Sequence, residues 1–257
     1  MPPPRLPAEL LDHIVDLLHD EEDALKSCCL ASRSWIPRTR RHLFDNIRFH
    51  TAWNVESWKD AFPDPSTSPA CYTKTLFIGF PQFVTAVDAG ERGWISTFSQ
   101  VIHLELSAKG KDPNLSPFHG FSPVVKSLHM ILGVIPPSQI FDLIYSFPLL
   151  EDLSVIARDV LPRGGFDTQP ISVQPSCACP PAFTGFLKLS AETGMDPIAS
   201  RLLSPPSSLH FWRLDLTWKG MEDVSLTTAL VERCHSTLEI LSVECSLFRT
   251  SVLRLGQ

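Results

Sequence analysis

The sequence has no run of eighteen apolar residues, so it contains no candidate for a transmembrane helix. Its first residues, Met1 to Arg5, lack the apolar core of a secretory signal peptide. It also has no excess of positive charge, because 22 Lys and Arg residues stand against 28 Asp and Glu residues. The formal net charge of -6 argues against a nucleic acid or an anionic membrane as a partner. The seven cysteines are odd in number and mostly lie among apolar residues, as expected for reduced thiols. We therefore expect a cytoplasmic or nuclear protein.

Motifs of catalysis and metal binding are missing as well. The sequence has no Gly-x-Gly-x-x-Gly, no phosphate-binding loop, no Gly-x-Ser-x-Gly and no His-Glu-x-x-His. Cys177 and Cys179 form a close pair, but a zinc site needs four ligands, usually from two such pairs. No second spaced pair and no His-x-x-x-His follows it. We expect no enzymatic activity, no metal and no cofactor.

The composition that remains is that of a globular chain with a substantial core. Hydrophobic residues make up 44% of the 257 residues and charged residues 19%. The 23 prolines are spread along the chain and indicate many loops between short elements.

The first fifty residues have the pattern of a small helical domain. Pro7 suits the first turn of a helix, and Glu9 lies near the positive end of its dipole. Apolar residues then recur every three or four positions, at Leu10, Leu11, Ile14, Val15, Leu17 and Leu18. The acidic run 20–23 can start a second helix, and a third segment closes at Phe44. A domain of this size cannot bury so much apolar surface within itself. Either another protein covers this surface, or the block is a helical cap packed on the next domain.

Particular residues of this block resemble the F-box domain. The matching pattern is Leu6-Pro7-x-Glu9-Leu10-Leu11-x-x-Ile14, a leucine-rich second segment, and Ala31-Ser32-Arg33-Ser34-Trp35. The family often has Val and Cys where this chain has Ala31 and Ser32. The resemblance covers residues 5–49 and implies a three-helix fold that docks onto the Skp adaptor of a Skp–cullin–F-box ubiquitin ligase. The contact residues that it implies are Leu6, Pro7, Leu10, Ile14, Leu18, Leu25, Leu30 and Trp35.

A repeat follows the helical block. Apolar–x–apolar triplets begin at Leu76, Leu104, Leu128, Leu153, Leu187, Leu214 and Leu241, at intervals of 28, 24, 25, 34, 27 and 27 residues. Five of them have a further apolar residue three positions earlier, namely Val101, Val125, Leu150, Phe211 and Leu238. The pattern is similar to that of leucine-rich repeats. Alternation with a period of two places the triplet leucines on one face of a short strand.

Helical patterns lie between these predicted strands, at residues 139–147 and 226–234. Strand, loop and helix together make one turn of an α/β solenoid, whose turns must stack to bury their apolar faces. A doubly wound α/β domain would also alternate strands and helices, but would favour longer apolar strands. We therefore expect an α+β protein: a three-helix F-box followed by an irregular leucine-rich-repeat-like solenoid of about seven short parallel strands. This arrangement resembles the F-box-like proteins that are abundant in mushroom-forming fungi.

The expected boundaries are a helical domain at 5–49, a linker at 50–72 and the solenoid at 73–257, with a Pro/Gly-rich loop at 162–182. The last segment is too apolar for a solvated tail, through Leu247, Phe248, Val252, Leu253 and Leu255. It either folds over the open edge as a cap or starts a repeat that a shortened chain lacks, and we favour the second alternative.

Two functional hypotheses follow. In the first, the chain is a substrate-recruiting adaptor, whose F-box holds the ligase and whose solenoid holds a target protein. The expected target contacts are outward-facing strand residues, namely Glu105, His129, Lys188, Asp215 and Glu244. In the second, the chain is a ligase-independent protein-binding scaffold with a degenerate F-box.

Overall fold

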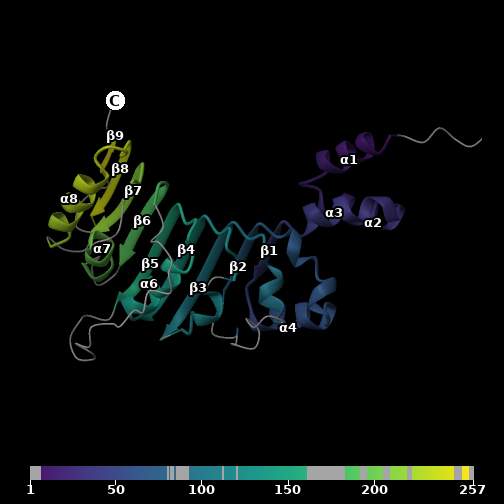
Figure 1. Cartoon of the computed structure of the whole chain (residues 1–257), viewed down its shortest axis with the longest axis horizontal. Helices are drawn as coiled ribbons and strands as arrows, with labels where there is room; N and C mark the ends of the chain where they lie inside the picture. Colours follow the sequence, from purple (N-terminus) through teal and green to yellow (C-terminus); the bar gives the residue numbers. More distant parts are fainter. Residues whose placement is uncertain are drawn as a thin grey trace, which may run out of the picture.

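The computed structural model describes residues 7–79, 81, 84, 93–111, 113–119, 121–160, 183–191, 196–204, 209–218, 222–245 and 251–254. It is a mixed α and β structure, with a helical region at one end and a large sheet beside it (Figure 1). Among these residues, no helix is long and apolar enough to cross a lipid bilayer.

The helical region contains three α-helices, as the sequence predicted. These are α1 (Ala8–Leu17), α2 (Glu22–Ala31) and α3 (Ile36–Leu43), and a 3-10 helix, η1 (Arg33–Trp35), joins the last two. Helices α1 and α2 both pack on α3. Their small core is formed by Val15, Leu25 and Cys28. Three buried apolar side chains are few for a region of three helices, so much of the apolar surface of α1 and α2 stays exposed.

A cluster of charged side chains fixes α1 on α3. The carboxylate of Asp16 accepts hydrogen bonds from Nε of Arg38, at 2.6 Å, and from Nη2 of the same guanidinium. Nε2 of His42 lies 2.7 Å from Oδ1 of the same carboxylate. The hydrogen bonds from Arg38 and His42 hold the pKa of Asp16 well below its usual range. Arg38 therefore forms its ion pair within the chain itself.

The sheet has nine described strands in strictly sequential order, β1 to β9. They are β1 (Asn46–Phe49), β2 (Thr75–Ile78), β3 (His103–Lys111), β4 (Ser127–Ile135), β5 (Asp152–Val160), β6 (Phe186–Ala191), β7 (Arg213–Trp218), β8 (Ile240–Cys245) and β9 (Ser251–Arg254). The first eight are parallel, and β9 runs antiparallel to β8. All seven predicted triplets lie in strands, β2 to β8. A doubly wound sheet would reverse its strand order at a switch point, so that alternative is wrong.

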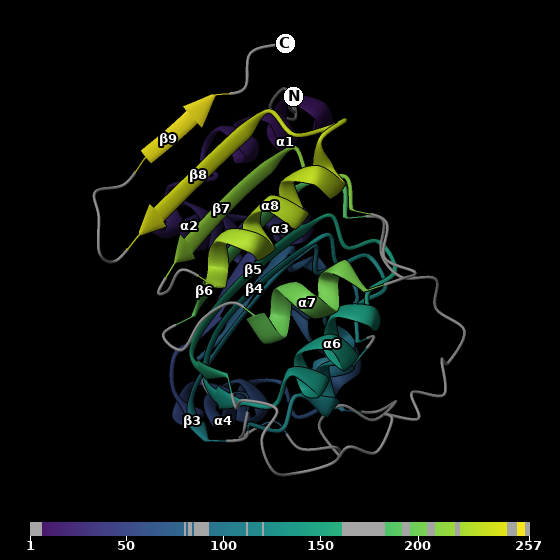
Figure 2. The same ribbon diagram turned by 90° about the vertical axis from the view of Figure 1, so that its left-hand side faces the viewer.

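The helices that follow the strands lie on one side of the sheet and leave the other side open (Figure 2). They are α4 (Ala52–Ala61), α6 (Pro137–Tyr145), α7 (Asp196–Leu203) and α8 (Glu222–Cys234). Helices α6 and α8 correspond to the two predicted helices. The first leucine of each triplet points to this side, and six of the seven are at most 2% exposed. The apolar residue three positions before five of the triplets is buried as well.

Strands β2 to β8 begin with a similar backbone contact to the preceding repeat. The carbonyl of Lys74, for example, accepts the N–H groups of both Ile102 and His103, at 2.8 and 2.9 Å. The equivalent carbonyls of Asp45, Ile102, Lys126 and Trp212 each accept two N–H groups in this way. Glu151 and Gly185 each accept one, at 3.1 and 3.0 Å. The repeat seen in the sequence is therefore also a repeat of backbone hydrogen bonding.

Residues 50–72, expected as a linker, contain ordered elements that the sequence analysis did not predict. Besides α4 they form two 3-10 helices, η2 (Pro65–Thr67) and η3 (Pro69–Tyr72). Helix α4 starts with a capping box between Thr51 and Asn54. It buries Trp58 against Phe49 and Phe98, with ring centroids 5.7 and 5.6 Å away. Strand β1, also not predicted, joins the sheet inside the range assigned to the helical domain.

Two expectations concern segments with little or no described structure. The Pro/Gly-rich loop 162–182 lies outside the described residues. In the apolar C-terminal segment, Val252 and Leu253 belong to β9, which pairs with the edge of β8, whereas Leu247, Phe248 and Leu255 are not described.

Candidate functional site

An exposed apolar surface lies on α1 and α2, which project beyond the β1 end of the sheet (Figure 1). Leu10, Ile14 and Leu17 follow one another at intervals of four and three residues and so share one side of α1. Their exposed fractions are 51%, 42% and 68%, and that of Leu30 on α2 is 90%. Isolated exposed leucines are ordinary, but four within one small helical region indicate a contact surface.

Seven of the eight predicted docking residues are described, and they fall into three groups. Pro7, Leu10, Ile14 and Leu30 are exposed, and Leu18 and Trp35 are half-buried. Leu25 is 1% exposed and packs inside the helical region. Leu6 lies outside the described residues. Leu17 was missed, although its spacing from Ile14 could have identified it.

The open face of the sheet carries a second candidate surface. Strand register aligns one residue from each of eight strands in a row, in the order Arg48, Phe77, Glu105, His129, Ser154, Lys188, Asp215 and Ser242. Four of the predicted target contacts are members of this row. The fifth, Glu244, is exposed and pairs with Thr217. It lies two residues beyond Ser242 on β8 and therefore on the same face of the sheet. All five therefore lie on the side of the sheet that the helices leave open.

Both acidic residues of this row have a basic partner. Nη2 of Arg48 lies 3.6 Å from Oε2 of Glu105. Arg213, on the same strand as Asp215, donates from Nε and Nη2 to the two carboxylate oxygens, at 3.1 and 2.9 Å. Its guanidinium also lies 5.1 Å from the ring centroid of Phe186. Lys188 differs, because no described carboxylate lies within ion-pair distance of its Nζ.

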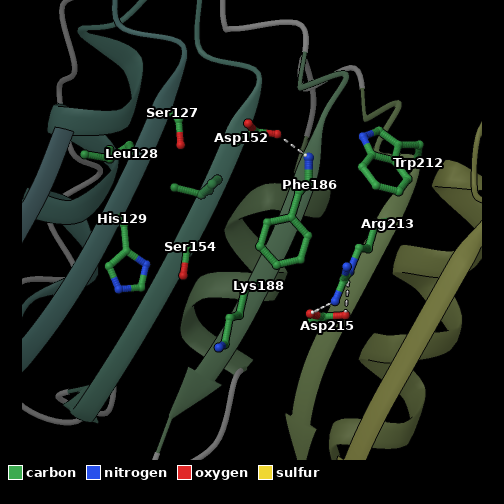
Figure 3. Close-up of a pocket in the computed structure, with 11 residues that line it drawn as sticks. Ser127, Leu128, His129, Asp152, Ser154, Phe186, Lys188, Trp212, Arg213 and Asp215 are labelled. Carbon is green, nitrogen blue, oxygen red and sulfur yellow. Dashed lines mark hydrogen bonds and ion pairs between the residues drawn. The ribbon is translucent and has the colours of Figure 1, made fainter. Parts of the chain in front are cut away.

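A groove of about 590 Å³ opens over β4 to β7 (Figure 3). Its lining residues are Ser127, Leu128, His129, Asp152, Leu153, Ser154, Phe186, Lys188, Trp212, Arg213 and Asp215. Trp212 is 38% exposed at the rim. The carboxylate of Asp152 points towards β6, where its Oδ1 accepts the N–H of Phe186 at 2.7 Å. Of these lining residues, only His129, Lys188 and Asp215 were predicted from the sequence as target contacts.

Ser154 lies at the bottom of the groove with an unused hydroxyl. The residue is 7% exposed, and its Oγ has no hydrogen-bond partner among the described residues. Figure 3 shows it between His129 and Lys188, its neighbours in the row. A buried hydroxyl without a partner is costly, which makes this position unusual.

The surroundings of His129 favour the neutral form of its imidazole. Partial burial lowers its pKa, the charge of Glu105 opposes this effect, and the charge of Lys188 adds to it. A neutral imidazole offers one N–H donor and one acceptor nitrogen. The groove therefore has three neighbouring groups able to donate hydrogen bonds, on His129, Ser154 and Lys188.

Within the described ranges, no group of three or more His, Cys, Asp and Glu side chains is arranged to hold a metal ion. Cys177 and Cys179, the close pair of the sequence analysis, lie outside those ranges. Comparisons with family models, with curated proteins and with solved structures found no match to this chain.

Proposed function

We propose that the chain is a substrate-recruiting adaptor of a Skp–cullin–F-box ubiquitin ligase, with a docking surface on α1 and α2 and a target-binding surface on the open face of the sheet. The observation that carries the proposal is the exposure of Leu10, Ile14, Leu17 and Leu30 on a small helical region with an F-box-like sequence. Full burial of a leucine contributes roughly 1.5–3 kcal/mol. A partner that covers these side chains would gain several such contributions.

In this function the chain performs no bond chemistry. It holds a target beside the ligase, so that ubiquitin transfer becomes effectively intramolecular. The separation of the two surfaces supports such a role, because the helical region lies at the β1 end and the groove lies over β4 to β7 (Figure 1). The proposal implies a cytoplasmic or nuclear protein.

A second candidate function is a protein-binding scaffold that no longer couples to a ligase. It is favoured by Ser32, which stands where the F-box family often has Cys. Its Oγ accepts the N–H of Ser34 at 3.3 Å and lies 2.8 Å from the Ser34 hydroxyl, so a polar cap occupies a position expected to be apolar. In that case the open face would still bind a partner, whereas α1 and α2 would not bind a Skp adaptor.

Co-expression with the cognate Skp adaptor separates these two functions. The full chain is captured on a column and the co-eluting adaptor is measured for the wild type and for a Leu10→Ala/Ile14→Ala/Leu17→Ala variant. A Leu149→Ala/Trp53→Ala variant is the matched control, since these side chains are 51% and 74% exposed but lie outside α1 and α2. We expect capture by the wild type and the control, and loss of at least tenfold in the triple variant. Absence of adaptor from the wild-type column would favour the scaffold.

A further inference from the structure

The groove on the open face contains one cation without an ion-pair partner among the described residues. Arg213 is engaged by Asp215, and Arg48, further along the row, is engaged by Glu105. The carboxylate of Asp152 is turned towards the N–H of Phe186, and Figure 3 shows the Phe186 ring between this carboxylate and the ammonium of Lys188. The charge of Lys188 is therefore available to a ligand.

The unused hydroxyl of Ser154 lies beside this cation. Register places Ser154 directly between His129 and Lys188, on adjacent strands that are about 4.8 Å apart. The side chains around it cover its Oγ in the free protein. Ser154 nevertheless lines the groove beside the flexible four-carbon stem of Lys188, so a ligand that displaces the neighbouring side chains would reach the hydroxyl. An acceptor above Ser154 would then meet donors from all three residues.

The shape of the groove favours a polypeptide as the ligand. Small-molecule sites bury most of their ligand in a concave pocket, whereas this groove lies on the face of the sheet that the helices leave uncovered (Figure 2). It crosses four strands, or about 15 Å, which is the length of four or five extended residues. The Phe186 ring and the half-exposed indole of Trp212 offer apolar surface beside the polar centre.

We infer that this groove binds an extended segment of a partner protein through one carboxylate side chain, which is held by Lys188, Ser154 and His129. The inference rests on the proposed function, in which the open face is the target-binding end. A carboxylate fits better than a phosphate, because only one cation among the described residues of the groove lacks an ion-pair partner, and a phosphate dianion is usually held by several charge-assisted hydrogen bonds. The net charge of -6 makes unspecific attraction of acidic peptides weak, so their retention would report this site.

The test uses the immobilised full chain and four pools of acetylated, amidated heptapeptides. The central residue is Glu, Gln, phosphoserine or Lys, and the other positions hold mixtures of uncharged residues. Retained peptide is quantified for the wild type, Lys188→Gln, Ser154→Ala and the matched control Lys74→Gln. Lys74 pairs with Asp45 at 3.0 Å just before β2, outside the groove.

We expect the wild type and Lys74→Gln to retain the Glu pool about tenfold more than the Gln pool, as expected for a charged hydrogen-bonded contact. Lys188→Gln should abolish this preference. Ser154→Ala should reduce it several-fold and at the same time raise Tm, because the substitution removes a buried hydroxyl without a partner.

Equal retention of the Glu and Gln pools by the wild type would overturn the inference, as would an unchanged preference in Lys188→Gln. Tenfold stronger retention of the phosphoserine pool would overturn the assignment of a carboxylate. A lower Tm of Ser154→Ala would show that its hydroxyl is already satisfied. These readouts need no Skp adaptor, so loss of the adaptor function alone would leave a Glu preference intact.

Discussion

The close approach of Gly185 to Asp152 leads to a quantitative prediction about the pairing of β5 with β6, the two strands with the longest interval between their triplets. A Cβ at position 185 would overlap Oδ1 of Asp152 and lie 3.0 Å from the backbone C of Glu151. The same Oδ1 accepts the N–H of Phe186 at 2.7 Å. At the start of most strands, one backbone carbonyl of the preceding repeat accepts two N–H groups. At β6 the carbonyl of Glu151 accepts only the first, from Gly185, and the side chain of Asp152 accepts the second, from Phe186. Gly185→Ala should displace this carboxylate and leave the N–H of Phe186 without its acceptor.

The expected energies follow from the loss of one hydrogen bond. A hydrogen bond to a charged group contributes about 1.5–3 kcal/mol, so Asp152→Ala should lower the free energy of unfolding by that amount. Gly185→Ala should lose the same bond, offset by about 0.4–1 kcal/mol because alanine restricts the unfolded chain. The double variant loses the bond only once. Its destabilisation should therefore be at least about 1 kcal/mol less than the sum of the two single effects.

Urea denaturation of the four proteins, followed by circular dichroism, measures this coupling. The control cycle combines Gly185→Ala with Asp64→Ala, because Asp64 also accepts a backbone N–H, that of Ser66 at 3.0 Å, but at the distant helix η2. The control effects should add to within about 0.5 kcal/mol. If the effects of Gly185→Ala and Asp152→Ala on the free energy of unfolding also add within this limit, the two positions do not share one hydrogen bond.

Three further predictions concern stability and reactivity. Because the folded-state pKa of Asp16 is depressed, its stabilising effect is complete above the unfolded-state pKa of about 3.9 and is lost as the pH falls below that value. Asp16→Asn should thus flatten the dependence of Tm on pH between pH 5 and 3, and an unchanged slope would contradict this. Phe118→Ala, at a fully buried site, should cost about 3–5 kcal/mol in urea unfolding, against less than about 0.5 kcal/mol for the exposed Leu149→Ala. Burial raises the pKa of the Cys234 thiol, so iodoacetamide at pH 7.5 should label it at least tenfold more slowly than the exposed Cys71, as measured by peptide mass spectrometry.

The strands that sequence analysis predicted are those with an apolar–x–apolar triplet. The triplet works because a leucine that alternates with a polar residue has only one way to face the core of a sheet. Strand β1 also contains such a triplet, Ile47-Arg48-Phe49, but it was missed because it begins with isoleucine and lies inside the range assigned to the helical domain. Its pairing with Thr75 to Ile78 is what defines it. Helix α4 was missed because its Trp53 is 74% exposed, which obscures the apolar period, although its capping box was visible in the sequence.

The groove was predictable only in part, for a related reason. The middle residue of a triplet must face away from the core, which is how His129, Lys188 and Asp215 were identified. Phe186 and Asp152 come next to each other only through the register between β5 and β6, which the interval of 34 residues hides. Ser154 occupies a triplet centre as well, but a serine has no distinctive sequence signal. Whether its hydroxyl finds a hydrogen-bond partner depends on the side chains of the two neighbouring strands.

Because the strands lie in sequential order, the number of repeats sets the distance of a site on the sheet from the helical region. Each repeat moves the chain one strand spacing, about 4.8 Å, away from the helical region. The groove begins at β4, three spacings beyond β1, and Ser154 on β5 is four spacings, or on the order of 20 Å, from it. The interval of 34 residues between β5 and β6 costs only about 0.3 kcal/mol more in loop closure than one of 25. Loops between strands can therefore lengthen without altering this distance, whereas the gain or loss of a single repeat before β4 would move the groove by a fixed step.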